Sequence, residues 1–264
     1  MKEIKKHGLS FVEMESNTEE NDSFNIAKEL IENLFFDMAK LSTKYCNDIF
    51  CDLPYTYSER RLDCVLLPAL SKLCNSMVMV EVPAVRECAN RRFSVDKSNG
   101  RIDYWCIYKN YSFVIELKHS FDCFTTDTTR ERNLTSRWVK MHEQLQSLEK
   151  EIKKYEEATK GVIRIGLHTI TSYSSQKPDT QLLKAFKYCI PETFERFQKE
   201  FGKKYPSLKP DFIICWKIPT KIVETYDWTY PGYGLSLKSI QRLNIMEQSN
   251  NACSTHRNYS IELY

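Results

Sequence analysis

Apolar and polar residues alternate along the chain with two different periods, which predict a domain of helices and strands. Apolar residues recur every three or four positions over residues 23–45 and about 135–157, the pattern of amphipathic helices. Apolar runs of strand length occur at 77–85, 102–108, 111–118, 161–170 and 211–218. Because a long helical segment separates the third run from the fourth, a crossover between parallel strands is expected. The predicted class is α/β, with a central mixed sheet flanked by helices.

The chain of 264 residues is expected to form a single domain between two less ordered ends. Residues 1–22 are polar and acidic, which predicts a flexible acidic leader. The domain is predicted to span 23–246, and a loosely ordered tail is predicted over 247–264. Within the domain, the polar and basic stretch 87–100 is expected to be a loop.

A further helix is predicted from Ser58, a residue type that caps helix N-termini. Glu59 and Asp63 lie one turn apart beside its apolar stripe. Pro68 lies inside this segment and predicts a kink or a break.

Runs 102–108 and 111–118 predict a β-hairpin, because only the polar pair Lys109-Asn110 separates them. In the register set by this turn, Asp103 lies opposite Glu116, and opposed side chains share one face. A one-residue slip of the register would destroy this pairing.

Lys118 projects to the same face as Glu116, because side chains alternate along a strand. Charged residues are rare in an apolar strand unless they are paired or bind a metal. Two opposed carboxylates repel each other unless a cation lies between them, and hard divalent ions such as Mg²⁺ prefer oxygen ligands. The alternative is a solvated salt-bridge cluster at a sheet edge.

The pattern Asp103 … Glu116-Xaa-Lys118 resembles the PD-(D/E)XK nuclease superfamily, with Ile102 where that pattern has Pro. By its order of elements the resemblance extends over a core of about 57–218 and implies a restriction-endonuclease-like fold. It also implies that Asp103, Glu116 and the backbone carbonyl of Leu117 bind Mg²⁺, for which Mn²⁺ can substitute. Lys118 would position or activate the attacking water.

The resemblance suggests three further site residues. A helix before the sheet often supplies another acidic metal ligand, for which Glu59 is the first choice and Asp63 the second. Gln144, on the predicted long helix, matches a glutamine that some relatives place near the scissile phosphate. Acidic residues at a helix start can instead be dipole partners, and helices commonly carry exposed glutamines.

The formal net charge of +3 is weak evidence for nucleic-acid binding, so the distribution of charge matters more. Basic residues gather in segments 86–101 and 130–140, on both sides of the hairpin in sequence. They predict a groove that tracks phosphates, although exposed charged loops are the ordinary alternative. The candidate nucleic-acid-binding residues are Arg91, Arg92, Arg101, Arg132 and Arg137.

The ten cysteines include no Cys-Xaa-Xaa-Cys pair, which argues against a structural zinc site. No apolar run is long enough to cross a bilayer, and no export signal is recognisable, so a cytoplasmic protein without membrane contact is expected.

The function predicted from the sequence is metal-dependent hydrolysis of phosphodiester bonds by an endonuclease, with DNA favoured over RNA. Restriction or phage defence is the setting suggested by analogy with the superfamily. Two alternatives stay open: a catalytically silent nucleic-acid-binding or assembly subunit on the same fold, and a scaffold that binds no nucleic acid. No DNA-reading motif is visible, so a protein partner or a homodimer could select the target.

Overall fold

A computed structural model of the chain describes residues 2–6, 9–15, 22–50, 54, 59–89, 95–123, 131–148, 152, 159–173, 210–217, 238–247 and 260–261. The strands are β1 (Lys2–Lys6), β2 (Leu9–Glu15), β3 (Val78–Ala89), β4 (Val95–Tyr108), β5 (Tyr111–Cys123), β6 (Val162–Tyr173), β7 (Phe212–Lys217), β8 (Lys238–Glu247) and β9 (Ser260–Ile261). The helices are α1 (Asp22–Lys44), the π-helix η1 (Tyr45–Phe50), the 3₁₀-helix η3 (Glu59–Leu62), α2 (Asp63–Leu73) and α3 (Glu131–Gln146).

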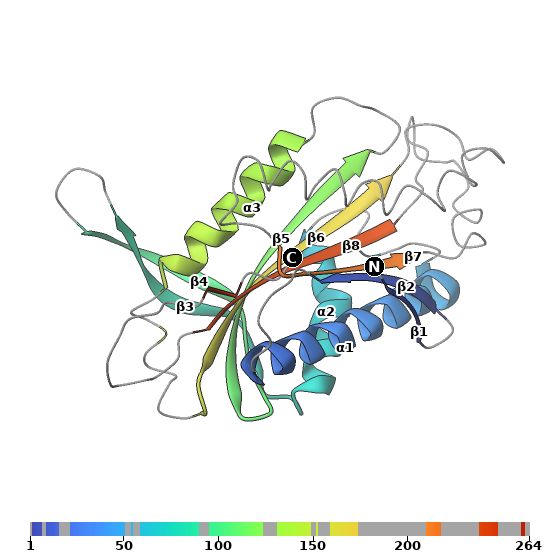
Figure 1. Ribbon diagram of the computed structural model, residues 1–264, viewed down its shortest axis with the longest axis horizontal. Helices are drawn as coiled ribbons and strands as arrows, with labels where there is room; N and C mark the ends of the chain where they lie inside the picture. The colour runs from blue at the N-terminus through green and yellow to red at the C-terminus, as the bar shows by residue number, and fades with distance from the viewer. Residues whose placement is uncertain are drawn as a thin grey trace.

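Within these residues, nine strands join into one mixed sheet in the order β1-β2-β7-β8-β6-β5-β4-β3, with β9 beside β8. The β5–β6 pair is parallel and the other neighbours are antiparallel. Figure 1 shows α3 on one face of the sheet and α1 and α2 on the other. The predicted α/β class, with a mixed sheet flanked by helices, is confirmed.

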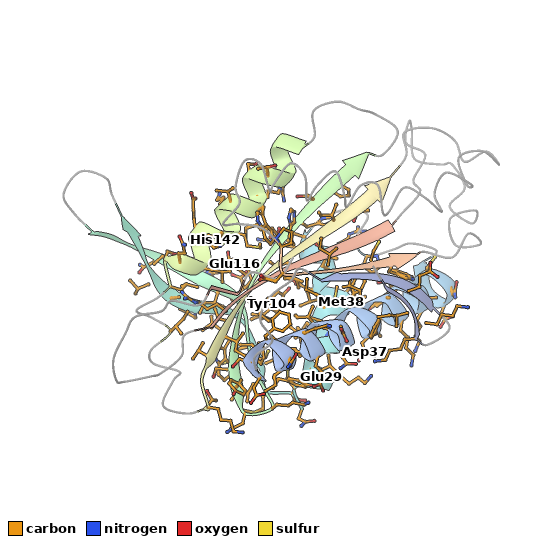
Figure 2. The ribbon with its side chains drawn as sticks, viewed as in Figure 1. Glu29, Asp37, Met38, Tyr104, Glu116 and His142 are labelled. Atoms are coloured by element: carbon orange, nitrogen blue, oxygen red, sulfur yellow. The ribbon has the colours of Figure 1, made fainter. Side chains whose placement is uncertain are left out.

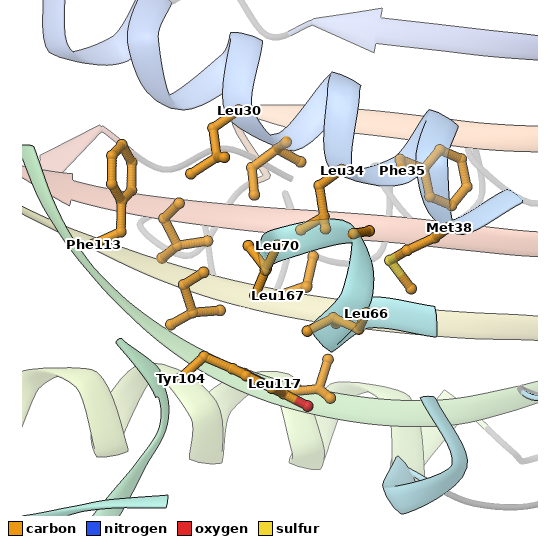
Figure 3. Packing of buried hydrophobic residues seen from close by; sticks show 14 of the residues in the cluster. Leu30, Leu34, Phe35, Met38, Leu66, Leu70, Tyr104, Phe113, Leu117 and Leu167 are labelled. Atoms are coloured by element: carbon orange, nitrogen blue, oxygen red, sulfur yellow. The ribbon is translucent and has the colours of Figure 1, made fainter. Parts of the chain in front are cut away.

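The main apolar core lies between the sheet and the pair α1 and α2. Figure 3 shows Leu30 and Leu34 of α1 and Leu70 of α2 packed toward Phe113 and Leu117 of β5. The burial of α1 follows the three- and four-residue spacing of its apolar positions, as the sequence predicts. A smaller apolar cluster, which includes Val114 and Ile102, lies apart from this core.

The β4–β5 hairpin has the predicted turn and register. Lys109 and Asn110 have φ of 48° and 67°, the positive values that a two-residue type I′ turn requires at both central positions. The regular pairing runs from Tyr108↔Tyr111 to Tyr104↔Ile115, so the next position along each strand brings Asp103 toward Glu116.

The strand β4 is irregular at Asp103. Ile102 packs in the smaller cluster and Tyr104 in the main core, although residues two apart on a regular strand share a face. On the neighbouring strand, Glu81 lies between the partners of Ile102 and Tyr104 and has a φ of 53°. Asp103 therefore lies where the strand changes the face to which its side chains point.

The described residues differ from three expectations about chain order. Residues 2–6 and 9–15, expected in a flexible leader, form two strands, and β2 pairs with β7. Much of the expected loop 87–100 belongs to the long β3–β4 ribbon, whose pairing extends to Ala89↔Val95. In the expected tail, Ser260 and Ile261 pair with β8.

Backbone pairing explains these differences, because ladder hydrogen bonds can hold polar segments in a sheet without an apolar run. The alternation of Val12 and Met14 with Glu13 and Glu15 was the available signal for β2. Lys6 Nζ also donates a 2.7 Å hydrogen bond to Asn33 Oδ1, which ties β1 to α1.

The remaining differences concern the helices and one strand. Helix α3 begins at Glu131 and ends at Gln146, earlier than the predicted limit of residue 157. Pro68 lies within α2 without ending it, and Ser58, the expected cap, lies outside the described residues. The strand β8 was not predicted. In the described part of the chain, no helix is long and apolar enough to span a membrane.

Candidate active site

Asp103, Glu116 and Lys118 meet on the face of the sheet that α3 covers. Lys118 Nζ lies 3.1 Å from Glu116 Oε1 and 3.9 Å from Asp103 Oδ2. It also donates to the carbonyl oxygen of Leu117 at 2.8 Å, while the Leu117 N–H donates to Asp103 Oδ2 at 2.7 Å. The three residues expected to act together are therefore adjacent, around the backbone of Leu117.

Arg86 is a member of this cluster that the sequence did not reveal. Its guanidinium group donates to Glu116 Oε2 at 2.9 Å, and both side chains are almost fully buried. It donates further to the carbonyl of Gln144 at 2.9 Å and to the carbonyl of Arg101. Figure 2 places Glu116 beside α3. Arg86 thus joins the C-terminal turn of α3 to β4 and β5.

Gly100 makes room for the Arg86 side chain. A Cβ atom at residue 100 would come within 2.5 Å of Arg86 Nε and 2.7 Å of its Cδ, closer than real Cβ contacts. The glycine that precedes the Asp103 motif thus has a steric role: it lets the arginine cross β4 on its way to Glu116.

Asp103 has the most perturbed carboxyl of the cluster. Burial, followed by the negative charge of Glu116, raises its pKa from 3.8 to about 6, against the opposing effects of Lys118 and the Leu117 N–H. Glu59 adds a smaller contribution that also raises this pKa. A carboxyl whose pKa lies near the working pH because of burial and a neighbouring acid is typical of functional sites.

Glu59 and Asp63 have different surroundings. Glu59 Oε2 accepts a 3.0 Å hydrogen bond from the backbone N–H of His119 and lies 3.9 Å from Arg137, so it borders the cluster. Asp63 instead accepts a hydrogen bond from the hydroxyl of Tyr104, whose ring packs in the main core. Glu59, the first choice for a further metal ligand, therefore lies at the edge of the site, whereas the carboxylate of Asp63, the second choice, is hydrogen-bonded to Tyr104.

Gln144 borders the site through its backbone. Its carbonyl accepts from Arg86, and among the described residues its side-chain oxygen Oε1 is buried without a hydrogen-bond partner. An unpaired buried amide oxygen costs free energy, and a ligand or an ion is one kind of partner that would satisfy it.

The oxygen donors at this site fit a hard divalent cation. Asp103, Glu116 and the Leu117 carbonyl are the donor types that Mg²⁺ and Mn²⁺ take. No group of three or more His, Cys, Asp or Glu side chains in the described ranges is arranged to hold a metal. Glu59 thus does not complete a three-acid group with Asp103 and Glu116.

The candidate nucleic-acid-binding arginines are dispersed. Arg101 is exposed and pairs with Glu81 at 2.7 Å, whereas Arg137 of α3 donates to the carbonyl of His119 at the site's border. Arg132 belongs to α3, and its side chain lies outside the described residues, as do Arg91 and Arg92.

Two buried histidines, His119 and His168, complete the surroundings of Lys118. His119 Nε2 lies 3.0 Å from Thr171 Oγ1, and burial, followed by the charge of Arg137, lowers the pKa of His119 to about 4. His168 Nε2 lies 2.8 Å from Ser120 Oγ, and its ring stacks on Trp138 of α3. The sequence signal for these neighbours was the pair of polar residues His119 and Ser120 directly after the apolar run 111–118.

Comparisons with known proteins identify no relative: no family model, no curated protein and no solved structure matches this chain. The case for a function therefore rests on the geometry of the site.

Proposed function

We propose that this chain is a metal-dependent nuclease that hydrolyses phosphodiester bonds, with DNA as the favoured substrate. The observation that carries the proposal is the convergence of Asp103, Glu116 and Lys118 around the Leu117 carbonyl. The antiparallel pair β4–β5, with α3 and the parallel strand β6 after it in the chain, is the order of elements expected of a restriction-endonuclease-like core.

In this proposal Asp103, Glu116 and the Leu117 carbonyl hold Mg²⁺, or Mn²⁺ in its place. The bound ion supplies a Lewis acid that polarises the phosphate and acidifies a bound water. Lys118 contributes a positive charge and N–H donors that orient this water and stabilise charge on the phosphate. Arg137, half exposed at the border of the site, is placed to contact a neighbouring phosphate.

The test is a cleavage assay with the purified chain on double-stranded DNA, single-stranded DNA and RNA, in Mg²⁺, Mn²⁺ or EDTA. We expect cleavage that requires the metal and that falls by about 10²-fold or more in Lys118→Ala and Asp103→Ala. Lys40→Ala, an exposed position on α1 at the opposite face of the sheet, is the matched control and should keep full activity. Wild-type-like cleavage by either site variant would overturn the assignment.

A second function, a catalytically silent nucleic-acid-binding or assembly subunit, is favoured by one observation. Both oxygens of Glu116 are already paired, one with Arg86 and one with Lys118, so the network can be satisfied without a metal. This alternative predicts binding of nucleic acid that weakens as salt is added, with no cleavage in either metal. The same assay, run beside a binding titration in rising salt, separates the two functions.

A further inference from the structure

The carboxylate of Glu116 lies between two cationic side chains that are held in different ways. Arg86 binds Oε2 and is also fixed by two backbone carbonyls, those of Gln144 and Arg101, with its stem packed over Gly100. Moving the guanidinium would break all of these bonds inside the protein. Arg86 is therefore a permanent part of the site.

The contacts of Lys118 differ from those of Arg86 because they all lie within the candidate metal site. In the described part of the chain, its ammonium group meets three oxygen groups: the Leu117 carbonyl at 2.8 Å, Glu116 Oε1 at 3.1 Å and Asp103 Oδ2 at 3.9 Å. These are the three ligands assigned to the metal under the proposed function. The ammonium group donates hydrogen bonds to the two nearer oxygens and pairs with Asp103 through charge alone.

We infer that the Lys118 ammonium group is the resident cation of this oxygen cluster, and that a divalent ion binds by displacing it. The inference rests on the proposed metal-dependent function. A flexible four-carbon stem allows the ammonium group to move while the backbone of β5 stays in place. Its side chain is 14% exposed, against 2% for Glu116, so it already reaches toward solvent.

The displacement couples two steps of the proposed function. While Lys118 occupies the oxygen cluster, its positive charge is paired with the carboxylates of Asp103 and Glu116 and is not available to a phosphate. If a divalent ion neutralised these carboxylates, the ammonium group would be released and its charge would become available to a phosphate. Lys118 thus serves as a placeholder before metal binding and as a substrate contact after it.

The test measures Mn²⁺ binding to the full chain without nucleic acid, by electron paramagnetic resonance or calorimetry, in wild type and in Lys118→Ala. Removing the competing cation is expected to tighten Mn²⁺ binding by at least about tenfold, equivalent to about 1.4 kcal/mol. The same variant should lose cleavage, so affinity and activity move in opposite directions. Lys72→Ala is the matched control, because Lys72 pairs with Asp37 on the opposite face of the sheet and should leave Mn²⁺ binding unchanged.

The outcomes separate the inference from the proposed function. Equal or weaker Mn²⁺ binding by Lys118→Ala, with metal-dependent cleavage by wild type, overturns the inference and leaves the nuclease proposal standing. Absence of Mn²⁺ binding in both proteins overturns both proposals. Binding by the variant alone would show that the ion does not displace Lys118 in the wild type, which overturns the inference.

A second measurement uses the wild-type chain and does not depend on the folding of a variant. Acetylation of Lys118 by a water-soluble acylating reagent is followed by mass spectrometry with and without Mg²⁺, with Lys72 as the internal reference. Displacement predicts that Mg²⁺ increases the acetylation of Lys118 relative to Lys72. An unchanged or decreased ratio at saturating Mg²⁺ overturns the inference.

Discussion

The two faces of strand β5 are built for different purposes. Phe113, Ile115 and Leu117 pack in the main core against α1 and α2, whereas Glu116 and Lys118 lie in the charged cluster that reaches α3 through Arg86. Successive residues of one strand thus enter an apolar core and a buried charge network in turn. Burial of apolar area explains the first face, because it stabilises the fold without directional requirements.

The charged face is harder to explain by stability. Removing ions from water is costly, and a buried ion pair is often no more stabilising than an apolar pair of similar size. Stability alone is therefore a weak explanation for the network of Arg86, Glu116, Lys118 and Asp103, and the proposed function gives these charges a role that the apolar face does not need. The predictions below test whether the two faces differ in this way.

The largest effect is expected from Arg86→Gln, which leaves Glu116 buried without its fixed partner. Breaking one side of a buried pair costs about 3–5 kcal/mol of folding free energy. Denaturant unfolding of wild type and variant measures this loss directly, and Arg86→Lys, which keeps the charge but not the planar donors that also bind the Gln144 and Arg101 carbonyls, should lose less. A loss below about 1 kcal/mol would place the pair among ordinary surface ion pairs.

Arg101→Gln is the control for this prediction. Arg101 lies on the neighbouring strand and pairs with Glu81 at 2.7 Å, but both side chains are mostly exposed, at 67% and 59%. Exposed pairs contribute about 0–1 kcal/mol, so this variant should unfold almost as wild type does. The contrast between the two arginines isolates burial as the cause.

The sequence predicted the parts of the fold whose signals are local. The apolar spacing of α1, the Lys109-Asn110 turn and the crossover to the parallel strand β6 all appear in the structure. The meeting of Asp103 with Glu116 followed from the turn alone, because one turn fixes the register of a whole hairpin.

The sequence could not predict contacts that depend on distant pairing. Arg86 lies 30 residues from Glu116, just before the stretch 87–100 that was expected to be a loop, and it reaches the site only because β3 pairs with β4 beyond Gly100. Strands β2 and β8 were missed for the same reason, since β2 pairs with β7, and β8 pairs with β6 and β7, all remote in the chain. Local periodicity carries no information about such partners.

An intermediate effect is expected from Leu34→Ala on the apolar face. Leu34 is fully buried in the main core, and truncating a buried leucine costs about 2–5 kcal/mol, through lost apolar contact and the cavity that remains. At temperatures where the variant stays folded, Mn²⁺ binding should be unchanged, because the charged cluster lies on the other face of β5. Lys40→Ala on the same helix is the control, with no expected loss. A large change in Mn²⁺ affinity in Leu34→Ala would show that the faces are coupled.

The smallest effect is a gain in stability, expected from Asp103→Asn in EDTA. Burial and the charge of Glu116 raise the pKa of Asp103 to about 6 in the folded protein, so the folded state holds this proton more tightly than the unfolded state does. The stability that this provides is fully present below about pH 4 and is lost as the pH rises through 6. At neutral pH the ionised carboxyl therefore weakens the fold.

Asparagine removes this charge and keeps an oxygen that can accept the Leu117 N–H. Asp103→Asn should therefore be more stable than wild type at pH 7.5, by about 1–3 kcal/mol, with the difference shrinking as the pH falls toward 4. Thermal unfolding across this pH range measures both quantities. Asp37→Asn, which breaks a bidentate pair with Lys72 on the apolar face, should gain nothing. If Asp103→Asn also gained nothing at neutral pH, the carboxyl would be an ordinary structural acid, and the charged face would lose its distinction from the apolar one.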